Sequence, residues 1–181
     1  MTRRRLAGAT LATAVLALSS VCAHAEEFTA KFSGFQELGG LNAETGAILS
    51  EGTATASLDL DRNHKTLGFK LTFSGLSAVT QAHIHFGKNH VPGGIIVFFC
   101  SNLPNPPAGT QACPAAAGTV TGTITGANVV GPAAQNISPG DFDGLEDAII
   151  SNTAYGNIHT AKFPAGEIRG QIRRSDQDDD R

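Results

Sequence analysis

Hydrophobic and polar residues alternate along several stretches of the chain, as they do in strands that bury one face of a sheet. The pattern is clearest over residues 28–33, 53–60, 67–73 and 119–124. A polar turn over residues 61–64 separates the second stretch from the third. These two stretches therefore predict a hairpin with a solvated His64 at its tip.

Other segments extend this prediction. Residues 95–99 form a continuous apolar run, which predicts a strand buried on both faces. Residues 154–172 predict a C-terminal hairpin, again from alternation. Helical spacing occurs over residues 141–150, where Asp141 supplies a start signal. Short strands with frequent turns predict an all-β sandwich or barrel with one short helix.

Residues 1–25 have the three parts of a secretory signal peptide. Arginines at positions 3–5 precede an apolar run over 6–18, and residues 23–25 offer a small-x-small cleavage site. The apolar run is too short for a convincing membrane span. We therefore expect a secreted or periplasmic protein with no membrane span after cleavage. The arginines fit an ordinary signal and also resemble a twin-arginine signal, so the export route stays open.

Removal of the signal leaves 10 Lys and Arg against 16 Asp and Glu, a net charge of −6. The remaining chain has no basic patch and no aromatic ladder, so nucleic acid is not an expected partner. Part of the negative charge lies in residues 173–181, which we expect to form an acidic disordered tail.

Two cysteines, Cys100 and Cys113, remain after cleavage. In an oxidising compartment two cysteines are expected to pair, and this bridge would staple the proline-rich loop between them. Oxidised cysteines offer no thiol chemistry, and no Ser-His-Asp or Cys-His arrangement can be argued. The sequence therefore predicts no catalytic residues.

Residues 82–87 read Ala-His-Ile-His-Phe-Gly and predict a strand on which His83 and His85 share a face. His159 lies on the polar face of a strand distant in sequence. If these strands are neighbours, three imidazoles converge, which is the pattern of a zinc or copper site with an open position. The alternative is a polar network that only stiffens the sheet.

The polar faces of the C-terminal hairpin supply candidate residues around such a site. These are Asn157, Glu167 and Arg169. A carboxylate such as Glu167 could orient one imidazole from behind. Because a metal binds neutral imidazole, we expect affinity to fall as the pH drops through about 6.5, the ordinary histidine value.

Four motifs together resemble the CHRD domain, a family first named in chordin. They lie at residues 82–87, 93–95, 154–160 and 164–172. The resemblance runs from about residue 28 to residue 172, and we take residues 26–172 as the domain. It implies an immunoglobulin-like Greek-key fold, an extracellular location and a binding or interaction module with no settled activity. The expected partner is an extracellular or periplasmic protein or a small ligand.

The His-x-His-x-Gly element at residues 83–87 is also similar to copper/zinc superoxide dismutase. That similarity implies copper ligands at His83, His85 and His159, and hence a copper carrier or a dismutase-like enzyme as the alternative function. There is no recognisable zinc loop, and His90 is the only further candidate ligand.

Overall fold

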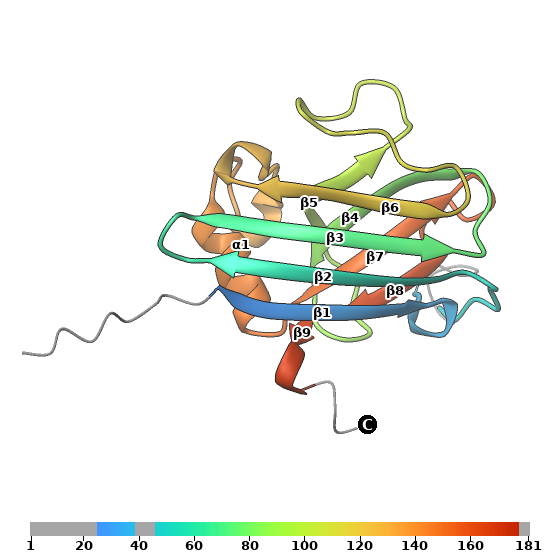
Figure 1. Cartoon of the computed structure of the whole chain (residues 1–181), viewed down its shortest axis with the longest axis horizontal. Coiled ribbons are helices and arrows are strands. Elements are labelled where there is room, and N and C mark those ends of the chain that lie inside the picture. Colours follow the sequence, from blue (N-terminus) through green and yellow to red (C-terminus); the bar gives the residue numbers. More distant parts are fainter. Residues whose placement is uncertain (1–24, 39–45, 178–181) are drawn as a thin grey trace, which may run out of the picture.

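Nine antiparallel strands form a sheet that curls back on itself into two layers (Figure 1). The structure is a computed structural model that describes residues 25–38 and 46–177. Its strands are β1 (Glu26–Ser33), β2 (Thr53–Asp61), β3 (Thr66–Ser74), β4 (Val79–Phe86), β5 (Gly94–Ser101), β6 (Gly118–Ile124), β7 (Ala154–Thr160), β8 (Ile168–Gln171) and β9 (Arg173–Arg174). The predicted all-β fold with one helix is confirmed.

The strand order is β5-β4-β7-β8-β1-β2-β3-β6, and β9 pairs with β1. The end strands β5 and β6 approach each other, so the sheet nearly closes into a barrel. Strands β4, β5 and β6 follow one another around this barrel, and β7 returns to lie beside β4. That arrangement is the Greek key expected from the family resemblance.

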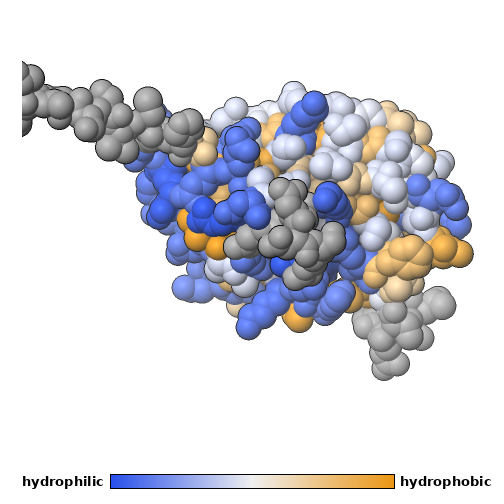
Figure 2. Space-filling view, turned by 60° about the horizontal axis from the view of Figure 1, so that its bottom comes forward, coloured by the Kyte–Doolittle hydropathy of each residue, from blue (hydrophilic) through white to orange (hydrophobic). Residues whose placement is uncertain are grey.

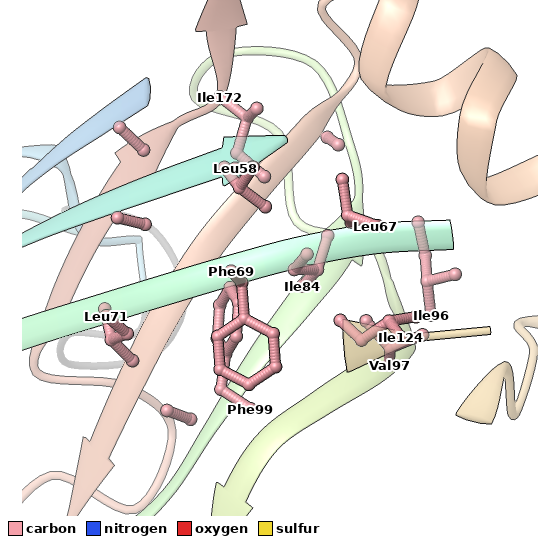
Figure 3. Close-up of a cluster of buried hydrophobic side chains, with 14 of the residues drawn as sticks. Leu58, Leu67, Phe69, Leu71, Ile84, Ile96, Val97, Phe99, Ile124 and Ile172 are labelled. Carbon is pink, nitrogen blue, oxygen red and sulfur yellow. The ribbon is translucent and has the colours of Figure 1, made fainter. Parts of the chain in front are cut away.

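The strands β1, β2 and β3 follow the predicted alternation. Phe28, Leu58 and Phe69 are paired in register across the three strands, and their side chains are buried. Figure 3 shows such side chains meeting those of the other layer, including the rings of Phe69 and Phe99, whose centroids are 4.9 Å apart. Each fully buried side chain of this size contributes roughly 1.5–3 kcal/mol to folding.

The apolar run in β5 is explained differently from the prediction. The register between β4 and β5 shifts twice, so β5 carries extra residues opposite β4. The shifts let two pairs of adjacent residues face the core, and these are Ile96 with Val97 and Phe99 with Cys100. Ile95 and Phe98 are only partly buried. The prediction of a strand buried on both faces is therefore wrong. The strand is apolar at consecutive positions because β-bulges turn adjacent residues toward the same core.

Helix α1 (Phe142–Ile150) covers the end of the barrel near the β2–β3 turn (Figure 1). The Asp141 side chain accepts a hydrogen bond from the Gly144 backbone N–H, so it caps the helix as predicted. Salt bridges from Lys65 to Asp143 and from Arg62 to Glu146 tie the turn to the helix. His64 lies on this turn with its side chain 79% exposed, which confirms its predicted place.

The predicted disulfide joins Cys100 to Cys113, with Cα atoms 5.0 Å apart. Asn102 holds the same loop from inside. Its amide group donates to the Val79 and Cys113 carbonyls and accepts from the Cys113 N–H. The long loop is thus fixed by one disulfide and by the hydrogen bonds of one side-chain amide, without regular structure.

The folded domain reaches further toward the C-terminus than residue 172. Arg173–Arg174 form β9, and a 3-10 turn (Ser175–Gln177) follows. Two predictions lie mainly or partly outside the described residues: the signal peptide over 1–25 and the acidic end of the tail. Within the described ranges, no helix is long and apolar enough to cross a membrane.

The described surface carries few large exposed hydrophobic side chains, and Phe35 and Leu49 are the most exposed of them. In Figure 2 hydrophilic side chains cover much of the face shown, and a larger hydrophobic patch lies at its lower right.

Candidate metal centre

Strands β4 and β7 bring the three predicted histidines together. The strands are neighbours, with His83 opposite Asn157 and His159 opposite Gln81. On β4, Ala82 and Ile84 point into the core, so the intervening histidines point to the other face. His159 leaves β7 on that same side. The expected convergence of His83, His85 and His159 is therefore present in the structure.

The cluster is tight and buried. One ring nitrogen from each histidine lies within 4.8 Å of those of the other two. The exposed fractions of the residues are 0% for His83, 8% for His85 and 6% for His159. Ring centroids are 5.3 Å apart for His83 and His85, and 4.9 Å apart for His83 and His159. The strands thus bring three imidazoles so close that small side-chain movements would let their nitrogens bind one metal ion.

Backbone carbonyls orient two of the rings. His85 Nδ1 lies 2.9 Å from the Gly93 carbonyl oxygen, and His159 Nδ1 lies 3.0 Å from the Pro164 carbonyl oxygen. A carbonyl can only accept, so each Nδ1 is assigned the proton. Each Nε2 then carries a lone pair, which is the form that binds a metal.

The third ring completes the arrangement. His83 Nδ1 lies 3.2 Å from His159 Nε2. Without a metal, His83 donates this hydrogen bond because the His159 nitrogen is an acceptor. Two nitrogens bound to one tetrahedral zinc at 2.0–2.1 Å would lie about 3.3 Å apart. A metal ion could therefore take the place of this hydrogen bond with little movement of the rings.

Two buried ring nitrogens have no hydrogen-bond partner, His83 Nε2 and His85 Nε2. An unpaired buried polar atom costs roughly 1–3 kcal/mol, so native structures rarely keep one without a reason. A metal that replaces the His83–His159 hydrogen bond would bind His83 through Nδ1, so of these two atoms it is His85 Nε2 that points to a ligand. A metal ion would satisfy the lone pair on His85 Nε2 directly.

The electrostatics of the cluster keep the rings neutral. Burial, with smaller contributions from the neighbouring His159 and His85, lowers the pKa of His83 to about 2. Burial also lowers the pKa of His85 to about 4, although the Gly93 carbonyl opposes this. The pKa of His159 is lowered by burial too, against the Pro164 carbonyl. The pKa of each ring lies below the ordinary histidine value, so near neutral pH all three imidazoles are in the neutral form that a metal requires.

The predicted surrounding residues lie near the cluster but make other contacts. Glu167 accepts hydrogen bonds from Ser50 and Thr160, so it does not orient an imidazole in this structure. Asn157 donates to the Glu37 carboxylate and the Ile168 carbonyl. Arg169 donates to two backbone carbonyls, those of Lys88 and Val91. The groups that orient the rings are backbone carbonyls. A side-chain motif in the sequence does not predict such contacts.

A pocket of about 330 Å³ opens beside the cluster. His85, Tyr155 and Arg169 line it, together with Glu37 and the exposed His90. The Tyr155 ring is stacked on His85 with centroids 4.8 Å apart, and its hydroxyl accepts a hydrogen bond from the Gly93 N–H. Tyr155 thereby supports the peptide that orients His85. Neither Tyr155 nor Glu37 was among the residues that the sequence predicted for the site.

A scan against protein-family models matches the CHRD domain over residues 28–172. The match covers most of the 181 residues, and the chain therefore belongs to the CHRD domain family. CHRD domains are extracellular binding and interaction modules, and the Cys100–Cys113 disulfide fits an exported protein. Searches of the curated proteins and of the solved structures found no match.

Proposed function

We propose that this CHRD domain is an exported metal-binding module that holds one copper or zinc ion through His83, His85 and His159. The observation that carries the proposal is the cluster itself: three buried, neutral imidazoles on two rigid strands, with the lone pair of His85 Nε2 left unpaired. At equal availability imidazole sites bind copper(II) more tightly than zinc, so copper is the favoured occupant.

The three ligands leave at least one coordination position open, because both metals take four or more ligands. His85 is the residue that the cluster shares with the lining of the pocket, so the pocket is the nearest described approach to that position. An open coordination position suits a carrier that exchanges its metal, or a module that presents the metal to a partner.

A dismutase-like enzyme is the alternative. The similarity extends to the copper-type trio, but within residues 25–38 and 46–177 no second group of three ligating side chains accompanies it. Superoxide consumption by the copper-loaded protein, compared with free copper at equal concentration, distinguishes this alternative from a carrier.

The direct test is titration of the tag-free, processed protein with copper(II) and zinc(II) by calorimetry near pH 7. We expect one ion per chain and a melting temperature that rises with the logarithm of metal concentration. Loss of an outer-shell partner typically costs 10–100-fold in affinity, so His83→Ala or His159→Ala should cost at least about 100-fold.

His64→Ala is the matched control, because His64 is exposed on the β2–β3 turn. Its affinity should equal that of the wild type. Absence of saturable binding to the wild type would refute the proposed function, and equal losses in His64→Ala and His83→Ala would show that binding is unspecific.

A further inference from the structure

The nitrogens of the candidate metal centre are closed off from solvent. His83 Nε2 and His85 Nε2 are buried atoms, and all three histidines of the cluster are buried residues. Strands β4 and β7, which carry them, are paired with another strand on both edges. Because opening these strands would unfold the sheet, a metal ion enters or leaves only when a segment that covers the cluster moves.

Residues 87–93, which we call the 87–93 loop, connect β4 to β5 and cover His85. Three of them, His90, Pro92 and Gly93, line the pocket beside the cluster. The Gly93 carbonyl accepts the hydrogen bond from His85 Nδ1. Outward movement of this loop would therefore widen the pocket toward a metal ligand.

The two ends of the loop are anchored to the sheet. At one end the Gln171 side-chain amide donates a hydrogen bond to the Gly87 carbonyl. At the other end the Gly93 N–H donates to the Tyr155 hydroxyl. Gly93 also lies so close to β4 that a Cβ atom on it would meet the Phe86 carbonyl oxygen at 1.7 Å. The middle of the loop can therefore open while its ends keep the chain in place.

The middle of the loop has few attachments. Residues 88–92 are all exposed. Among the described residues, the hydrogen bonds that tie these five to the rest of the domain both come from Arg169, whose Nη2 donates to the Lys88 and Val91 carbonyls at 3.0 Å. The Val91 N–H bonds within the loop, to the Lys88 carbonyl. Exposed segments with so few contacts open at a low free energy, so Arg169 largely determines how often this one opens.

Arg169 is itself held firmly in the fold. It lies on β8, is 2% exposed, and places its guanidinium 3.4 Å from the centroid of the Tyr155 ring. The other face of Tyr155 is stacked on His85. The tyrosine ring thus separates Arg169 from the metal ligand, and Arg169 can influence the metal through the loop without touching it.

We propose that Arg169 is a positioning residue that holds the 87–93 loop closed over the metal centre and thereby sets the rate at which the metal ion enters and leaves. The inference rests on the proposed function, since it requires the metal. Entry and release pass through the same open state, so the hold of Arg169 slows both and changes the dissociation constant little.

Tyr155 provides the signal for the test. It is the only tyrosine of a chain that has no tryptophan, and it is stacked on His85, so copper(II) bound at the centre should quench the intrinsic fluorescence. In stopped-flow mixing of the processed wild type with copper(II), the observed rate should rise and then reach a plateau, the rate of loop opening. A rate proportional to copper concentration throughout would overturn the proposal.

Release rates assign the hold to Arg169. Copper-loaded Arg169→Gln should lose its metal to excess EDTA about 10–100-fold faster than the wild type, because two hydrogen bonds from a charged group are lost. Its dissociation constant should change less than about fivefold. Loss of a positive charge alone would slow the release of a cation, so faster release identifies the loop contact. Arg173→Gln on β9 is the charge-matched control and should release copper at the wild-type rate.

A second control separates loop opening from global unfolding. Val120 is buried on β6, away from the loop, and Val120→Ala should lower the free energy of unfolding. This variant should still release copper at the wild-type rate. Release as fast as that from Arg169→Gln would show that metal exchange follows overall stability, and would overturn the role of Arg169.

The outcomes separate the two proposals. Absence of copper binding overturns the proposed function and this inference with it. Copper binding with release from folded Arg169→Gln no faster than from the wild type overturns the hold on the loop alone. If Arg169→Gln does not fold, the plateau in the wild-type binding rate decides.

Discussion

Strands β2 and β7 both alternate apolar and polar residues, yet they have different surroundings. On β2 the inward residues are buried and most outward residues are exposed. On β7 all seven residues are buried, including Tyr155, Asn157 and His159 on the outward face. The difference arises because connecting segments cover β7. They reach it through Glu37, Gly93 and Pro164, while the outer face of β2 meets solvent.

The comparison shows where a functional site can be recognised. Polar side chains on an exposed face can bond to water, so their presence there does not indicate a functional site. A buried polar face must satisfy its atoms, and most of the β7 face does so through backbone groups. The unpaired nitrogens of His83 and His85 are exceptions, and they belong to the proposed metal site.

The largest expected effect is a loss of folding stability in acid, caused by the buried histidines of the covered face. In the folded protein the pKa of His85 is lowered to about 4 and that of His83 to about 2, while an unfolded histidine titrates near 6.5. Below pH 6.5 the unfolded chain therefore takes up protons that the folded chain refuses, and stability falls. The loss should reach on the order of 3 kcal/mol for each of the two by pH 4.

The measurement is urea unfolding of the metal-free protein between pH 7.5 and 4. Stability independent of pH over this window would contradict the burial of neutral histidines. His64→Ala is a control that should retain the full pH dependence, because this exposed side chain lies on the opposite hairpin.

Removal of the disulfide tests how much the closed loop between Cys100 and Cys113 contributes to stability. Cys100 is the penultimate residue of β5, and the bridge closes a loop with a sequence separation of 13. Replacing both cysteines by alanine should lower the free energy of unfolding by about 3 kcal/mol, since the unfolded chain gains loop freedom. Denaturant unfolding measures this, and an unchanged midpoint would show that the loop is held by Asn102 and its neighbours alone.

A matched pair of substitutions sharpens the comparison of the two strands. Asn157→Ala on β7 removes a buried amide that donates to Glu37 and to the Ile168 carbonyl, and should cost about 1–3 kcal/mol. Thr55→Ala on the exposed face of β2 should cost less than about 1 kcal/mol. Equal costs would mean that the cover over β7 is not tight.

The smallest expected effect is that of mild acid on metal affinity. Three histidines with ordinary pKa values near 6.5 would lose roughly 50-fold in zinc affinity between pH 7.5 and 6. Because the pKa values of His83, His85 and His159 are all lowered, the folded protein should change by less than about threefold. Zinc calorimetry at both pH values checks this. The structure thus lowers the pH at which we expect metal affinity to fall, which the sequence alone placed at about 6.5.

The sequence was a good guide where the determining interactions are local. Alternation predicted the β2–β3 hairpin, and the period of two placed His83 and His85 on one face. The two bulges in β5 were missed, because a continuous apolar run has the same composition whether or not the register shifts. The burial of the histidines was also missed, because the segments that cover them lack periodicity and act through carbonyl groups.

The most direct test of the central claim is a crystal structure of the copper-loaded protein with anomalous scattering recorded at the copper edge. We predict one strong peak among His83, His85 and His159, at about 2 Å from a ring nitrogen of each. A structure from loaded crystals with no peak there, or with copper bound only elsewhere on the chain, would contradict it.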